Sequence, residues 1–158
     1  MTATVRTMRW WDVEAVADLE RELFAHDPWT VEQFWGELAH VPETRWYAVH
    51  EDDSGVDGYV GLFAVPPEAD VQTIAVAPRS QGRGLGRELL DALVVEAERR
   101  GCTQLFLEVR VDNEPAIALY ERLGFRDLGM RYPLREGTDL EIQLMGTSLA
   151  ELTAYFES

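Results

Sequence analysis

The stretch VQTIAVAPRSQGRGLGRELL, residues 71–90, changes character half-way along and indicates how the chain folds. Residues 71–78 are rich in small and β-branched apolar side chains, which is typical of a strand. The leucines at its end begin a pattern of helical spacing that continues to about Arg100, where Gly101 is a natural stop. Three glycines, at 82, 84 and 86, lie between the two patterns. We therefore expect a glycine-rich loop that joins a strand to the start of a helix.

The remaining chain shows the same two periodicities and no internal repeat. Apolar residues at helical spacing, together with a capping box at Thr30 and Gln33, predict further helices over residues 13–24, 31–39 and 113–123. Alternating segments bounded by turn residues predict further strands over residues 4–8, 44–51, 56–65, 104–111, 125–131 and 140–145. Residues 104–111 are apolar almost throughout, which is typical of a central strand covered on both faces.

This order of elements predicts an α/β fold of the mixed α+β kind. We expect a single domain, with a mostly antiparallel, mixed sheet of about seven strands and helices on both faces. A chain of 158 residues is long enough for one buried core and short for two. We place the domain at residues 1–146 and expect residues 147–158 to form a C-terminal tail with a helical pattern.

Charge and composition exclude several functional classes. The net charge of −15 disfavours direct binding to nucleic acid and favours a basic partner. All 14 basic residues are arginines, which removes the lysine-dependent phosphate loop and any lysine Schiff base. No apolar run reaches the roughly 18 residues of a membrane span, and no signal-peptide core is found, so we expect a cytoplasmic protein without a membrane partner. The single Cys102 is expected to be a buried, small apolar residue.

The glycine loop has the composition of a phosphate-binding loop. Glycines allow positive φ angles and a close approach of backbone to ligand. The first amides of the following helix lack partners within it and carry the positive end of its dipole. Arg79, Arg83 and Arg87 add charge, so the pattern favours a polyphosphate ligand. The alternative is a turn that only packs the helix onto the sheet. The dinucleotide fingerprint is excluded, because it has one further residue between its second and third glycines.

The run VAPRSQGRGLG, residues 76–86, resembles the Gln/Arg-x-x-Gly-x-Gly/Ala loop of the GCN5-related N-acetyltransferases, the GNAT family. Residues 27–38 and 105–125 look like segments of its RimI-type group, which acetylates the N-terminal amine of a ribosomal protein. The resemblance implies a GNAT-like domain that uses acetyl-CoA and no metal. It also implies the residues that bind acetyl-CoA, which are Ile74, Ala75, Val76, Arg79, Gln81, Gly82, Arg83, Gly84, Leu85, Gly86, Arg87, Asn113 and Tyr120.

Glu108 interrupts an apolar strand, where a buried charge without a partner costs several kcal/mol. Alternation places it on the same face as Arg110, so one interpretation is an ion pair between these two residues. The resemblance implies a different role. At this position Glu108 is the general base that removes a proton from the attacking amine, directly or through water.

Tyr120 lies in the run LYERLGF, residues 119–125, and one interpretation is that it packs with the neighbouring apolar residues. The resemblance implies instead that it is the general acid that protonates the CoA sulfur. Direct attack in a ternary complex is then expected, without an acetyl-enzyme. Asn113 is expected to cap its helix, and the resemblance implies that it also touches CoA.

The acceptor is less well defined. Trp29, Phe34 and Tyr132 are the residues that we expect to bind it, whereas the other tryptophans are expected in the core or the hairpin. The segment 130–145 lacks the Tyr-Tyr pair of RimI-type proteins. We predict a protein N-terminal α-amine as acceptor, with a small amine or a protein lysine as the alternative. A non-catalytic acyl-CoA-binding module is the alternative of another class. The histidines at 26, 40 and 50 lack metal-ligand spacing and are expected at the surface or in loops.

Overall fold

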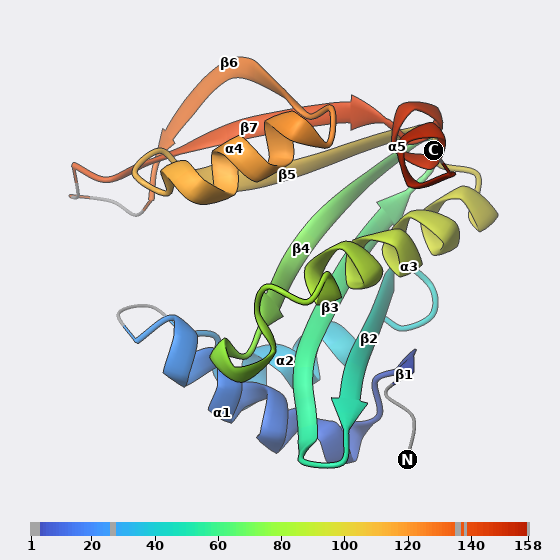
Figure 1. Cartoon of the computed structure of the whole chain (residues 1–158), viewed down its shortest axis with the longest axis vertical. Helices are drawn as coiled ribbons and strands as arrows, with labels where there is room; N and C mark the ends of the chain where they lie inside the picture. The colour runs from blue at the N-terminus through green and yellow to red at the C-terminus, as the bar shows by residue number, and fades with distance from the viewer. Residues whose placement is uncertain (1–3, 26–27, 135–136, 138, 158) are drawn as a thin grey trace. The chain divides into compact units, whose positions relative to one another are not determined.

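The computed structural model describes residues 4–25, 28–134, 137 and 139–157. Seven strands form one mixed sheet in the order β1-β2-β3-β4-β5-β7-β6, in which β4 and β5 run parallel (Figure 1). The predicted fold class is confirmed. The elements are β1 (Thr4–Thr7), α1 (Val13–Leu23), α2 (Val31–Leu38), β2 (Arg45–Asp52), β3 (Gly55–Val65), β4 (Glu68–Val76), α3 (Leu85–Arg99), β5 (Gln104–Arg110), α4 (Glu114–Arg122), β6 (Arg126–Pro133), β7 (Glu141–Ser148) and α5 (Leu149–Glu157), with 3-10 turns at Trp10–Asp12 (η1) and Pro78–Ser80 (η2).

The chain divides into two compact units, which are described separately. The first unit contains Met1–Phe63 and Gln72–Glu96, and the second contains Ala64–Val71 and Ala97–Ser158. The predicted boundary between a domain at residues 1–146 and a tail stays a prediction. Within the tail, residues 149–157 form the helix α5. No helix in the described ranges is both long and apolar enough to cross a membrane.

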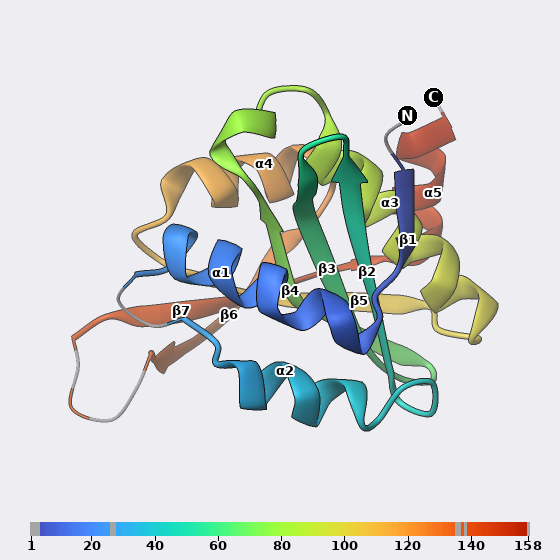
Figure 2. The ribbon, with the colours of Figure 1, turned by 90° about the horizontal axis from the view of Figure 1, so that it is seen from below.

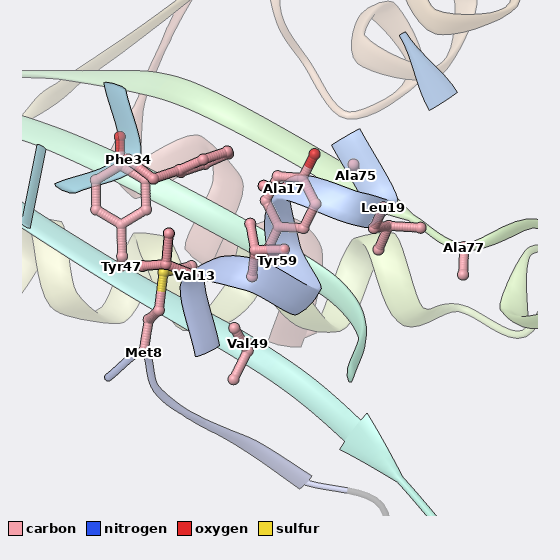
Figure 3. Close-up of a cluster of buried hydrophobic side chains, with 11 residues drawn as sticks. Met8, Val13, Ala17, Leu19, Phe34, Tyr47, Val49, Tyr59, Ala75 and Ala77 are labelled. Atoms are coloured by element: carbon pink, nitrogen blue, oxygen red, sulfur yellow. The ribbon is translucent and has the colours of Figure 1, made fainter. Parts of the chain in front are cut away.

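In the first unit, helices cover both faces of the strands. Helices α1 and α2 lie on one face of β2 and β3, and α3 lies on the other (Figures 1 and 2). The α1 side holds a core that includes Val13, Phe34 and Tyr59, none of which has exposed surface (Figure 3). On the opposite face Gly58 lets α3 approach, because a Cβ at this position would meet the Leu89 side chain at 3.0 Å. Helix α3 is thereby fixed on β3 close to the loop that precedes it.

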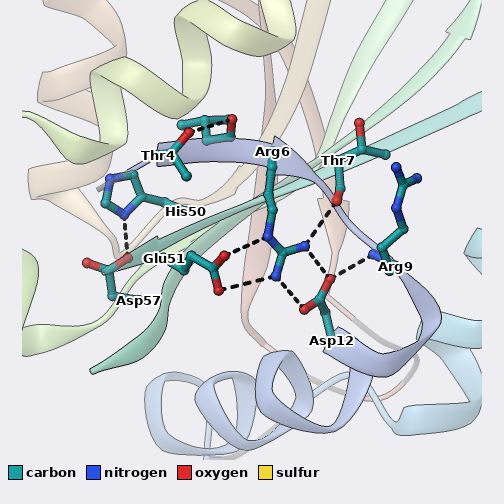
Figure 4. Close-up of polar contacts among 9 residues, drawn as sticks. Thr4, Arg6, Thr7, Arg9, Asp12, His50, Glu51 and Asp57 are labelled. Carbon is teal, nitrogen blue, oxygen red and sulfur yellow. Dashed lines mark hydrogen bonds and ion pairs between the residues drawn. The ribbon is translucent and has the colours of Figure 1, made fainter. Parts of the chain in front are cut away.

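A partly buried ion cluster fixes the start of α1 against the sheet edge. The Arg6 guanidinium donates to both Asp12 carboxylate oxygens at 2.8 Å and to Glu51 Oε1 at 2.8 Å (Figure 4). Asp12 also accepts the Arg9 backbone N–H at 2.8 Å. Burial alone would raise the pKa of Asp12, but the hydrogen bonds from Arg6 and Arg9 outweigh it and lower that pKa. Asp12 is only 5% exposed, so its pairing is a structural requirement.

Replacing Asp12 with asparagine is expected to lower the free energy of unfolding by about 1–3 kcal/mol at neutral pH, because Arg6 loses its buried partner. The lowered pKa means that this stabilisation is complete above the ordinary pKa of 3.8 and is lost as pH falls through the lowered value. Urea unfolding of the wild type and of Asp12→Asn should therefore be compared at pH 7 and at acid pH. The difference between their free energies of unfolding should become smaller at acid pH. Asp18→Asn, at an exposed ion pair with Arg21, is the matched control and should change stability little.

The second unit is built on β5, which pairs with β4 in parallel and with β7 in antiparallel register. Leu105, Leu107 and Val109 are buried on one face, whereas Glu108 on the other face is exposed. The central position predicted for residues 104–111 is thus confirmed, but burial alternates along the strand instead of being continuous. Cys102 is buried, as expected, and its thiol donates to the Glu68 carbonyl at 3.4 Å. Burial raises the pKa of this thiol, which disfavours the reactive thiolate.

Candidate active site

Two of the three loop glycines adopt a backbone conformation that other residues avoid. The φ angles of Gly82 and Gly84 are both +80°, whereas Gly86 lies inside α3 with an ordinary helical φ. A Cβ at Gly86 would lie 3.9 Å from Val76 Cγ2, which is ordinary van der Waals contact. The loop therefore requires glycine at 82 and 84, and these two residues orient the amides that precede α3.

Hydrogen bonds within the first unit hold the segment that leads into the glycines. The Gln81 side chain donates from Nε2 to the Val76 carbonyl at 3.0 Å, and the Ser80 amide donates to the Ala77 carbonyl at 2.9 Å. Arg79 is bound to Asp52, the last residue of β2, at 2.8 Å. The sequence predicts that the Arg79 guanidinium binds a phosphate, but here it forms an ion pair with Asp52. In this arrangement Arg79 helps to support the loop.

The other residues predicted to bind acetyl-CoA follow the path of β4 into α3. Arg83 and Arg87 are exposed, as a phosphate ligand would require. Along β4, Ala75 points into the core beneath α1, while Ile74 and Val76 are half-buried. Leu85 is buried and begins α3, and the Gly84 carbonyl accepts the Glu88 amide at 3.0 Å. The first turn of α3 thus begins directly at the glycine loop, with its free amides next to the two exposed arginines.

Replacing Gly84 with alanine is expected to raise the KM for acetyl-CoA by about tenfold, because an L side chain at φ +80° strains the loop by about 1–3 kcal/mol. The matched control is Gly86→Ala in the same motif, where the added methyl group has room. Steady-state kinetics on both variants checks the result. Equal effects of the two substitutions would contradict the assignment of the loop conformation.

In the second unit, Glu108 lies on β5 with its side chain exposed. The interpretation that it pairs with Arg110 is wrong, because Arg110 binds Asp112 through contacts of 2.7 and 3.0 Å. Within the described residues, no ion pair or hydrogen bond engages the Glu108 carboxylate. An exposed carboxylate in this state can accept a proton from a ligand, directly or through water.

Tyr120 is half-buried on α4, and its ring packs edge to face on Phe125, with 5.7 Å between the ring centroids. Burial raises the pKa of its phenol above the ordinary value of 10.0. Packing and acid catalysis are compatible here, since packing orients the ring and a raised pKa keeps the proton available at neutral pH. Asn113 caps α4, as predicted, by accepting the Ala116 amide at 3.2 Å.

The residues predicted to bind the acceptor have different environments. Phe34 is fully buried in the core and packs against Trp29 in a tilted arrangement, with 5.2 Å between the ring centroids. The buried Glu20 carboxylate accepts the Trp29 amide at 3.0 Å and also the Tyr59 hydroxyl, which fixes the segment before α2. Trp29 itself is half-buried. In the second unit, Tyr132 is 37% exposed on β6. Trp29 and Tyr132 therefore have surface for a ligand, while Phe34 supports Trp29.

Several expectations about histidine and tryptophan are wrong. His50 is buried on β2, at 6% exposure, and binds Asp57, whereas His40 is exposed as expected and His26 lies outside the described residues. Trp10, Trp11 and Trp35 are 56–71% exposed instead of buried. No group of three or more His, Cys, Asp or Glu side chains among the described residues could hold a metal ion.

Comparison with known proteins gives a consistent result. The model of the acetyltransferase (GNAT) family matches residues 6–125. The [ribosomal protein bS18]-alanine N-acetyltransferase of Salmonella typhimurium is 36% identical over 137 residues, which cover 85% of this chain and 90% of that protein. N-alpha-acetyltransferase RimI of Mycobacterium tuberculosis is 41% identical over 125 residues, 76% of each chain.

A solved structure agrees with these sequence relatives. The crystal structure of the ribosomal-protein-S18-alanine N-acetyltransferase from Escherichia coli has a TM-score of 0.80 and 29% identity, with 94% of each chain covered. The family match extends from β1 to the end of the LYERLGF segment and includes the glycine loop, Glu108 and Tyr120. The chain is therefore an N-acetyltransferase that belongs to the GNAT family.

Proposed function

We propose that this protein transfers the acetyl group of acetyl-CoA to the N-terminal α-amine of a protein, and that a ribosomal protein is its acceptor. The observation that carries the proposal is similarity along most of the chain to enzymes named for acetylating the alanine of ribosomal protein bS18. The loop at Gly82 and Gly84, in the conformation that an anion site needs, supports the cofactor. A cytoplasmic location, expected from the sequence, belongs to the same proposal.

The glycine loop would bind the pyrophosphate of acetyl-CoA. Its amides and the first amides of α3 donate to the phosphate oxygens, and Arg83 and Arg87 neutralise their charge. The backbone of Ile74, Ala75 and Val76 holds the pantetheine arm. An amide of the same strand segment stabilises the oxyanion that forms on the thioester carbonyl. This chemistry needs neither a metal ion nor a protein nucleophile.

Glu108 would accept the proton that the attacking amine loses. An α-amino group has a pKa near 8, so on the order of a tenth of it is neutral at pH 7, whereas a lysine with a pKa near 10.4 is almost entirely charged. A single exposed carboxylate is thus better matched to an α-amine than to lysine. The amine nitrogen bonds to the acetyl carbon as this proton leaves.

Tyr120 would supply the proton that the leaving group, the CoA sulfur, needs. When the tetrahedral intermediate collapses, the bond between carbon and sulfur breaks and the thiolate of CoA leaves. The phenol of Tyr120 protonates the sulfur, so that CoA departs as the thiol. The raised pKa of Tyr120 keeps the phenol protonated until this step.

The residues proposed for binding the acceptor are those with exposed surface, Trp29 and Tyr132, each considered within its own unit. A net charge of −15 favours a basic protein segment next to the acetylated residue. The missing Tyr-Tyr pair in residues 130–145 leaves a small amine or a protein lysine as the second candidate. In both cases the acetyl group moves directly from CoA to the amine.

A panel of acceptors tests this proposal. Initial rates with acetyl-CoA should be highest for peptides that carry the N-terminal sequence of bS18, and much lower for acetyl-capped lysine peptides and free polyamines. Inert N-terminal peptides would overturn the proposed acceptor. Incubation with labelled acetyl-CoA alone should leave the enzyme unlabelled, and a stable acetylated Cys102 would contradict direct transfer.

A further inference from the structure

A pocket in the first unit lies between the end of the β2–β3 hairpin and the start of α3. Its volume is about 250 Å³, and it is lined by His50, Asp52, Asp57, Ser80, Arg83, Leu85 and Glu88. Three of these polar residues are almost completely buried: Asp57 is 2% exposed, Ser80 3% and His50 6%. Neither the glycine motif nor the proposed acetyl transfer assigns them a role.

The three buried residues form one chain of hydrogen bonds with a carboxylate at its centre. Asp57 Oδ1 lies 2.5 Å from His50 Nδ1, and Ser80 Oγ donates to Asp57 Oδ2 at 2.7 Å (Figure 4 shows the first contact). The backbone carbonyl of Asp57 accepts the Ala77 amide at 2.7 Å. Asp57 therefore contacts both ends of the short segment 77–80: its backbone carbonyl binds Ala77, and its side chain binds Ser80.

This order of groups excludes a nucleophilic serine. In a catalytic triad the histidine lies between serine and carboxylate and removes the serine proton, whereas here Ser80 donates directly to Asp57. A buried carboxylate that accepts two hydrogen bonds is a strong, directional contact. This series of hydrogen bonds is thus suited to fixing the position of Ser80.

We propose that Asp57, with Ser80 and His50, is a positioning residue that holds the pyrophosphate loop in the form that binds acetyl-CoA. Ser80 ends the 3-10 turn Pro78–Ser80, and Gln81 and Gly82 follow it immediately. The position of Ser80 therefore determines where the loop amides point. The contact between Arg79 and Asp52 supports the same turn from the hairpin side. This inference rests on the proposed binding of acetyl-CoA at the loop.

The predicted consequence is a change in cofactor binding and not in chemistry. A loop whose amides are misplaced loses contacts that are made equally in the ground state and in the transition state. The KM for acetyl-CoA should therefore rise while kcat stays nearly constant. If the role were purely structural, the variants would melt at a lower temperature, but KM would not rise selectively while kcat stayed constant.

Ser80→Ala and Asp57→Asn test the proposal in the full-length protein. Calorimetric titration with CoA and steady-state kinetics with the best peptide are expected to show a dissociation constant and a KM raised by about five- to tenfold, with kcat preserved. Ser54→Ala, at an exposed serine of the β2–β3 turn, and Asp91→Asn, at an exposed carboxylate of α3, are the matched controls. Both controls should bind CoA like the wild type.

The outcomes separate this inference from the function on which it rests. Failure of the wild type to bind CoA would overturn the proposed function. Normal CoA binding by the wild type and unchanged binding by Ser80→Ala would overturn the positioning role alone. The loss of CoA affinity in the double variant should be smaller than the sum of the two single losses, because Ser80→Ala removes the hydrogen bond that Asp57→Asn weakens by removing its charge. Additive losses would contradict this. Ser80→Ala removes only one hydroxyl and keeps the test valid if Asp57→Asn does not fold.

Discussion

Glu108→Gln is expected to lower kcat by about 10²- to 10³-fold, because glutamine fills the same space but cannot accept the proton of the amine. The Glu108 side chain is exposed, so the variant should melt like the wild type. Its KM for acetyl-CoA should be nearly unchanged. Raising the pH should recover part of the lost rate, since a larger fraction of the amine is then neutral without help from the enzyme.

The matched control is Glu121→Gln, at an exposed carboxylate of the same unit on α4. It should leave kcat, KM and stability unchanged. A Glu108→Gln variant with wild-type kcat over the whole pH range would show that the base is another group or bulk water. CoA binding measured on the same preparation confirms that the variant is folded.

Tyr120→Phe is expected to lower kcat by about 10²-fold, because the variant keeps the aromatic packing on Phe125 and loses only the proton donor. Burial raises the pKa of this phenol, so its ionisation should not limit the wild-type rate below the ordinary value of 10.0. The alkaline limb of the pH–rate profile should accordingly lie above that value. Steady-state rates from neutral to strongly alkaline pH check both expectations.

Tyr155→Phe on α5 is the matched control for loss of a phenol in the same unit, and it should be fully active. If packing were the only role of Tyr120, the phenylalanine variant would also be fully active. A loss of thermal stability with unchanged kcat would lead to the same conclusion. Either result would remove Tyr120 from the chemistry.

Local sequence signals predicted much of the fold and of the cofactor loop. The capping box is one example: Thr30 and Gln33 exchange hydrogen bonds of 2.8 and 3.1 Å, as their spacing predicts. The glycines are another, since Gly82 and Gly84 have the positive φ angles that the loop was expected to need. These features depend on residues within a few positions of each other, so the sequence alone contains them.

The support of the loop could not be predicted in the same way. Asp57 lies 23 positions before Ser80 and seven after His50. It meets His50 through the register of β2 and β3, and it meets Ser80 in the 3-10 turn η2 that follows β4. That register pairs His50 with Gly58 and has a bulge directly after it. Sequence patterns predict where strands lie, but they do not predict which residues pair across neighbouring strands. The only available signal was an ionisable residue inside the otherwise apolar strand 56–65, which demands a partner.

The prediction of an ion pair between Glu108 and Arg110 was wrong for a related reason. Alternation correctly placed both side chains on one face of β5, yet Arg110 turns to Asp112 beyond the end of the strand. The exposed tryptophans show the same limit, because the sequence around Trp10 and Trp11 does not reveal that η1 leaves both side chains outside the core. Contacts at the ends of elements depend on packing that periodicity does not describe.

The central claim is acetylation of a protein N-terminal amine, and one measurement tests it most directly. A single peptide carries the free N-terminus of bS18 and an internal lysine, and it is incubated with enzyme and acetyl-CoA. Fragmentation in the mass spectrometer then locates the acetyl group. The account predicts acetylation of the α-amine alone, at a rate about 10²- to 10³-fold lower in the Glu108→Gln variant. Acetylation of the lysine, or no transfer to the peptide, would contradict it.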